Sequence, residues 1–211
     1  MTQRTKKVCA AAAVIFLYLT GIRLMSPFSV QIIPADRVSL ARSPADLSFV
    51  SDVIVVARPV KAGKNILIRD SHDGKVITGY TKTTVEVVDV MRGKVSIGDK
   101  LTLTEECYRS DFGTVLYTQG GYLPAHRNTD YLLFLKAYEP SSRYAGMYFP
   151  VDLEYGKYVI PDPSEISASA RSPEDLEINE QADLTQYRAW YDTVMQQYLQ
   201  DKKDGSIDPP F

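Results

Sequence analysis

Two short segments of the chain are apolar at nearly every position. They are DVIVVARPVK at residues 52–61 and DYLLFLKAY at residues 130–138. A strand with one solvent-exposed face alternates apolar and polar residues, so these runs predict strands buried on both faces. Such strands lie in the wall of a barrel or beneath a helix. Pro59 has no N–H to donate to a neighbouring strand, and we expect it at an edge or a bend.

The longest expected strand is ITGYTKTTVEVVDVM, residues 77–91. It follows a polar turn that contains Asp73-Gly74, which is a strong hairpin signal. Its apolar residues change parity between Val87 and Val88. A slip of one residue turns the following side chains to the opposite face, so we predict a β-bulge near these two valines.

Three shorter strands are expected further along the chain. KLTLTEE at residues 100–106 alternates regularly, with Leu101 and Leu103 facing inward. MYFPV at residues 147–151 and GKYVI at residues 156–160 surround a turn. Strands without alternating helices argue against a parallel, doubly wound sheet. We therefore predict a mainly β fold, a small antiparallel barrel of the oligonucleotide/oligosaccharide-binding (OB) type with five to six strands.

Two helices are expected around this barrel. ARSPADL at residues 41–47 returns as ARSPEDL at residues 170–176, but the similarity ends with the heptapeptide. Serine is a good N-cap and proline suits the first helical position, so we interpret both copies as helix starts rather than as a duplication. A C-terminal amphipathic helix is expected at residues 183–200. Its apolar stripe packs on the sheet or binds a partner, and it comprises Leu184, Tyr187, Tyr191, Val194 and Tyr198.

The N-terminal residues 1–28 have the pattern of an export signal. Arg4, Lys6 and Lys7 precede the apolar run VCAAAAVIFLYLTGI at residues 8–22. We expect a signal anchor, a single transmembrane segment with the C-terminal domain outside the cell membrane. The alternative is a cleaved signal peptide and a secreted protein.

The remaining boundaries follow from composition. Residues 29–160 form the predicted barrel domain, and residues 161–182 form an acidic linker rich in Pro and Ser. Residues 201–211 are expected to be a disordered tail. From residue 161 onward the chain has four basic and eleven acidic residues. This balance excludes nucleic acid as an expected partner, because affinity for phosphate backbones comes from clustered Lys and Arg.

Motifs for chemistry are scarce in the sequence. It has no His-Glu-x-x-His, Gly-x-Ser-x-Gly or Cys-x-x-Cys, and we expect no metal and no cofactor. His72 lies in the polar turn, and the Gly93–Gly98 spacing is that of an inter-strand turn rather than a phosphate loop. Cys107 is expected to be a buried or half-buried residue, with intermolecular pairing as the alternative.

Four stretches carry a resemblance as an ordered set: residues 46–60, 81–103 and 120–138, and the MYFPV…GKYVI ending. Together they resemble uncharacterised exported proteins of Gram-positive bacteria, often lipoproteins, and are similar to the netrin-like barrel of tissue inhibitors of metalloproteinases. The resemblance implies a fold and a compartment, and it implies no reaction. Those inhibitors engage a metal through an N-terminal cysteine, whereas the exported part of this chain has only Cys107. The missing lipoprotein cysteine favours the transmembrane anchor.

The connection at residues 107–129 is expected to be long, irregular and functional. Its tyrosines and arginines have the composition of recognition surfaces. We expect a non-catalytic binding module whose partner is an envelope protein or glycan, and the sequence sets no oligomeric state. The alternatives are an envelope hydrolase that uses His126 and a secreted, inhibitor-like module. The expected binding residues are Tyr108, Arg109, Phe112, Tyr117, Tyr122, His126 and Arg127.

Overall fold

The computed structural model describes residues 29–33, 39–160, 172–173, 175–179 and 184–200. Residues 1–28 and 201–211, predicted as the anchor and the tail, lie outside the described residues. In the described ranges, no helix is long and apolar enough to cross a membrane.

A closed five-stranded barrel forms the centre of the fold and confirms the mainly β prediction. The strands follow the order β8-β2-β4-β5-β9, and pairing of β9 with β8 closes the barrel. All pairs are antiparallel except β5 with β9, which is parallel. The barrel is compatible with the OB type. Its strands are β2 (Val53–Pro59), β4 (Val76–Arg92), β5 (Lys100–Glu105), β8 (Tyr131–Ala137) and β9 (Tyr148–Pro150).

The strands β2 and β8 are buried on both faces, as their unbroken apolar sequences predict. Along β2, Val53 and Val55 point into the barrel, whereas Ile54 and Val56 belong to a second apolar cluster on its outside. Two further strands extend the sheet: β3 (Lys64–Arg69) pairs with β4, and β10 (Lys157–Val159) pairs with β8.

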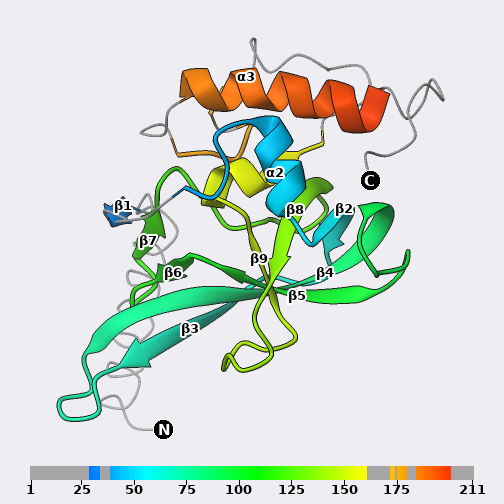
Figure 1. The fold of residues 1–211 in the computed structure, drawn as a ribbon. Helices are drawn as coiled ribbons and strands as arrows, with labels where there is room; N and C mark the ends of the chain where they lie inside the picture. The colour runs from blue at the N-terminus through cyan, green and yellow to red at the C-terminus, as the bar shows by residue number, and fades with distance from the viewer. Residues whose placement is uncertain (1–28, 34–38, 161–171, 174, 180–183, 201–211) are drawn as a thin grey trace, which may run out of the picture.

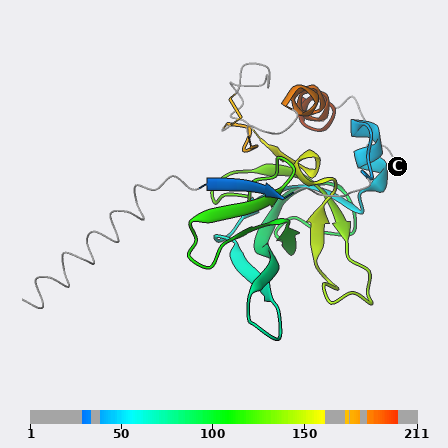
Figure 2. The ribbon, with the colours of Figure 1, turned by 90° about the vertical axis from the view of Figure 1, so that its left-hand side faces the viewer.

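Two helices cover the outer cluster (Figures 1 and 2). They are α2 (Pro44–Val50) and α3 (Leu184–Met195), the latter continuing as the π-helical segment η3 (Gln196–Gln200). The apolar stripe of α3 packs on the sheet, with Tyr187, Tyr191 and Val194 fully buried. The hydroxyls of these tyrosines donate to backbone oxygens of β10, Tyr187 to Lys157 at 2.9 Å and Tyr191 to Val159 at 2.8 Å.

The bulge predicted in the long strand is present. Ala57 pairs with Val87 and Val56 pairs with Asp89, so Val88 is left without a partner in the ladder. A second irregularity of the same pairing lies between Val55 and Ile54. Bulges increase the twist and bend the strand. The 17 residues of β4 pair with β2 and β5 in the barrel and with β3 in a hairpin.

The prediction of an irregular connection at residues 107–129 is wrong in its first half. This stretch forms the hairpin of β6 (Cys107–Arg109) and β7 (Val115–Gln119), and the extended residues 29–33 pair with β7 in parallel as β1 (Ser29–Ile33). Such short strands have little pattern of their own. Their pairing is fixed by β1, which is distant in sequence, and by packing against β3 and β4.

The two copies of the heptapeptide share a cap but not a helix. At α2, the Ser43 hydroxyl accepts from the Asp46 N–H at 3.1 Å, as predicted. At the second copy, the Ser172 hydroxyl accepts from the Asp175 N–H at 3.2 Å, but only a turn follows. Glu177 has a positive φ of 51°, which ends the helical path.

The residues after this turn are part of the core. Leu176 and Ile178 are buried, and Ile178 forms an isolated antiparallel bridge with Tyr122. The predicted linker at residues 161–182 therefore includes a segment that packs against the barrel. Its residues 161–171, 174 and 180–182 lie outside the described residues.

The two serine caps give a matched test of the helix start. We expect Ser43→Ala to lower the free energy of unfolding by about 1 kcal/mol, because α2 loses its cap. Ser172→Ala is expected to cost less than about half of that, because its cap serves an exposed turn. Urea unfolding of the full chain in detergent micelles measures both. Equal losses would contradict this view of the second copy.

Candidate functional site

The seven residues predicted for binding do not form one surface. Arg109, His126 and Arg127 line a common pocket. Tyr108 and Tyr117 stack on each other, with ring centroids 5.1 Å apart, on the opposite face of the β6–β7 hairpin. Phe112 is exposed at the tip of that hairpin, and Tyr122 is in the core.

The pocket, called the mouth pocket below, lies at the end of the barrel where the chain leaves β2 and returns as β3. It has a volume of about 450 Å³. Arg109, His126 and Arg127 contribute to its lining, and so do the small residues Ala62 and Gly63 of the β2–β3 connection. It is lined by Ala62, Gly63, Asn65, Thr81, Arg109, Leu116, Pro124, Ala125, His126 and Arg127.

Asn65 fixes the position of Arg109 in this pocket. Its side-chain amide donates to the Arg109 backbone oxygen at 2.9 Å, and its amide oxygen accepts from the Arg109 N–H at 2.8 Å. The two bonds join the start of β3 to the end of β6 as a strand neighbour would. The Arg109 backbone is thus held in place, and its side chain reaches the pocket.

The loop that carries His126 and Arg127 has no strand partner, yet buried side chains hold its backbone. Lys157 Nζ donates to the Leu123 oxygen, the Ala125 N–H donates to Glu105 Oε1, and the His126 N–H donates to the Tyr131 hydroxyl oxygen, each at 2.7 Å. Lys157, Glu105 and Tyr131 are all buried. A loop fixed at three successive points presents its exposed side chains in a defined geometry.

Glu105 is the centre of this buried network. Its Oε1 also accepts from the Tyr122 hydroxyl at 2.7 Å, and its Oε2 accepts from the Thr83 hydroxyl. Gly63 is needed beside it, because a Cβ there would lie 2.3 Å from Thr81 Cγ2 and 2.7 Å from Thr83 Oγ1. The network therefore forms the floor beneath the mouth pocket.

Lys157 connects the same network to the C-terminal segment. Its Nζ lies 3.6 Å from Glu177 Oε2, 4.9 Å from the centroid of Tyr122 and 5.0 Å from that of Tyr131. The Tyr131 hydroxyl donates to Glu177 Oε2. A buried ammonium group is costly unless it is paired, and here a carboxylate, a carbonyl and two ring faces surround it.

Burial keeps two weakly acidic groups beside Glu105 protonated, the Tyr122 hydroxyl and the Cys107 thiol. Burial, and then the nearby Glu105, raises the pKa of the Tyr122 hydroxyl well above its ordinary value, so it donates to Glu105 at all physiological pH. The same two causes raise the pKa of the Cys107 thiol. Cys107 is a free, fully buried cysteine, which agrees with the predicted buried role.

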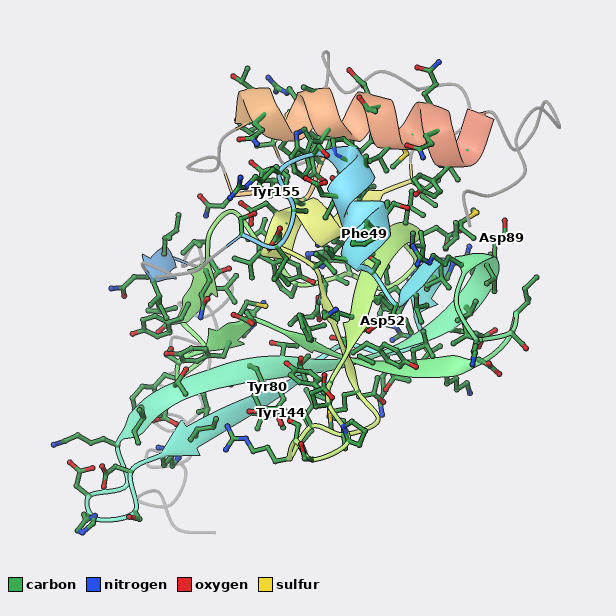
Figure 3. The ribbon with its side chains drawn as sticks, viewed as in Figure 1. Phe49, Asp52, Tyr80, Asp89, Tyr144 and Tyr155 are labelled. Atoms are coloured by element: carbon green, nitrogen blue, oxygen red, sulfur yellow. The ribbon has the colours of Figure 1, made fainter. Side chains whose placement is uncertain are left out.

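A second hollow, which the sequence did not indicate, lies on the outer face of β4 and β5. We call it the tyrosine groove, and its volume is about 210 Å³. The rings of Tyr80 in β4 and Tyr144 meet edge to face, with their centroids 5.4 Å apart (Figure 3). The centroid of the Tyr138 ring lies 4.9 Å from that of Tyr144. Arg143 Cζ lies 4.7 Å from the centroid of the Tyr144 ring. No local sequence pattern predicts this groove, because β4 and the loop after β8 are far apart in the chain and come together only when it folds.

The geometry around His126 does not pair it with the nearest acid in sequence. Asp130 is engaged by Arg58, with bidentate contacts of 2.6 and 2.7 Å. His72 is exposed and lies 3.4 Å from Asp70. The described ranges contain no group of three or more His, Cys, Asp or Glu side chains placed to hold a metal ion.

No protein-family model matches the chain, and no curated protein shows significant similarity to it.

The buried network can be tested separately from the pocket. We expect Glu105→Gln to lower the free energy of unfolding by about 2–3 kcal/mol. Both oxygens of Glu105 accept hydrogen bonds, whereas the NH₂ group of glutamine would be placed against hydrogen-bond donors. The control is Glu86→Gln on the exposed face of β4, for which a change below about 0.5 kcal/mol is expected. Urea unfolding measures both, and equal effects would contradict a central role for Glu105.

Proposed function

We propose that this protein is a membrane-anchored, extracytoplasmic binding module without catalysis. Its mouth pocket would take an acidic group of an envelope glycan. The export pattern of residues 1–28 supports the compartment, and the OB-type barrel supports a binding role, since such barrels bind oligosaccharides and oligonucleotides. We also propose that the barrel is of the netrin-like kind, as the ordered set of matching stretches suggests.

The observation that carries the proposal is the set of cations around one pocket. Arg109 and Arg127 both line it, together with His126. Guanidinium groups bind carboxylates and phosphates in a bidentate manner, which gives both affinity and orientation. An anionic ligand therefore suits the pocket better than a neutral one.

Concavity favours a glycan over an envelope protein. The pocket volume of about 450 Å³ lies within the range of small-ligand sites. Protein interfaces are broader surfaces and typically bury about 800 Å² on each partner. The fixed backbone of the loop at residues 123–126 favours tight binding, because little ordering is left to occur when the ligand arrives.

Binding of acidic and neutral sugars tests the proposal. We expect trigalacturonate to bind the full chain in detergent micelles more tightly than maltotriose, as measured by isothermal titration calorimetry. Arg109→Gln and Arg127→Gln should each weaken trigalacturonate binding about tenfold, because each removes one charge-assisted contact.

The matched control is Arg143→Gln, an exposed arginine in the tyrosine groove. Its affinity for trigalacturonate should equal that of the unmodified chain. Equal binding of the two sugars, or a loss in Arg143→Gln as large as in Arg127→Gln, would refute the mouth pocket as the site.

A further inference from the structure

The N-terminal strand fixes where the chain joins the folded body. β1 runs parallel to β7 in a register that places Ser29 opposite Val115. Val115 is the first residue of β7, directly after the tip of the β6–β7 hairpin. The chain therefore enters the described fold beside that hairpin tip (Figure 2).

The predicted anchor precedes this point at short range. The apolar run ends at Ile22, and Ser29 follows it by seven residues. Even a fully extended chain covers at most about 3.6 Å per residue, so Ser29 stays within about 25 Å of the end of the run. If that run spans a membrane, as the proposed function holds, the β6–β7 hairpin tip cannot lie far from the bilayer surface.

Two exposed apolar side chains lie at this end of the molecule. Phe112, at the tip of the β6–β7 hairpin, is 78% exposed, and Ile77, near the turn of the β3–β4 hairpin, is 62% exposed. An ion pair between Arg69 and Asp111 joins the two hairpins, and Arg69 also donates to the Gly74 oxygen at 3.0 Å. The two hairpin ends therefore form one connected surface.

Two acidic residues of these hairpin ends are paired with basic ones. Asp111 pairs with Arg69, and the Asp73 carboxylate lies 2.6 Å from Lys75 Nζ. The hydrogen bond from Lys75 lowers the pKa of Asp73. Acidic groups neutralised in this way reduce the repulsion that an anionic lipid surface would otherwise exert.

We propose that the ends of the β3–β4 and β6–β7 hairpins rest on the outer surface of the membrane. Phe112 and Ile77 enter the boundary between headgroups and acyl chains, where exposed aromatic and aliphatic side chains gain by leaving water. The inference rests on the membrane anchor of the proposed function and adds an orientation to it. α2 and α3, which lie on the other side of the barrel in both views, face away from the bilayer (Figures 1 and 2).

A single exposed apolar residue is normal on a protein surface, so exposure alone does not carry the proposal. Phe49 on α2 is 83% exposed, more than Phe112, yet it lies on the side away from both hairpin ends (Figure 3). The distinguishing feature of Phe112 is its place beside the point where the anchor meets the fold. Phe49 therefore serves as the matched control.

Fluorescence quenching by lipids tests the orientation. The full chain, with Trp190→Phe to remove its single tryptophan, is reconstituted into vesicles of phosphatidylcholine and phosphatidylglycerol with doxyl-labelled acyl chains. We expect Phe112→Trp to lose about half of its emission and to shift to shorter wavelength. Ile77→Trp should behave in the same way, and Phe49→Trp should be unchanged by the quencher.

Flotation of the same vesicles separates the two proposals. If the full chain does not float with them, the anchor fails, and the orientation that rests on it fails as well. If the chain floats but Phe112→Trp and Ile77→Trp are quenched no more than Phe49→Trp, the orientation is overturned and the anchored module stands. Circular dichroism confirms that each variant is folded.

Discussion

The burial of β2 and β8 on both faces is the constraint on which the structure depends. One face of each strand fills the barrel, and the other receives α2 and α3. Neither face could be left in water, because each fully buried Val, Leu, Ile or Phe side chain contributes about 1.5–3 kcal/mol. The C-terminal helix is therefore part of the domain, and its tyrosine hydroxyls are bonded to the backbone of β10.

The polar interior at one end of the barrel links this core to the candidate site. Glu105, Lys157 and Tyr131 satisfy the backbone of the loop at residues 123–126, which forms a wall of the mouth pocket. Through Glu177 the same network includes the segment just before α3. Partly satisfied networks of this kind are costly, whereas fully bonded ones give a unique structure. The geometry of the pocket is thus set by the core beneath it.

Much of the barrel could be predicted from local pattern, and the site only in part. Three features depend only on residues close together in the chain: the unbroken apolar runs, the parity change at Val88 and the Ser43 cap. The parity of Leu101 and Leu103 also places Glu105 inward, so the sequence contained a signal for the buried acid. The β1–β7 pairing and the tyrosine groove had none, because they join segments far apart in the chain.

The most direct test of the central claim is to locate a bound acidic sugar without altering the protein. Amide chemical shifts of the ¹⁵N-labelled full chain in detergent micelles would be recorded while trigalacturonate is added. The account predicts the largest shifts at Gly63, Asn65, Ala125, His126 and Arg127, which line the mouth pocket. Shifts that centre instead on the tyrosine groove, or no shift at any amide, would contradict it.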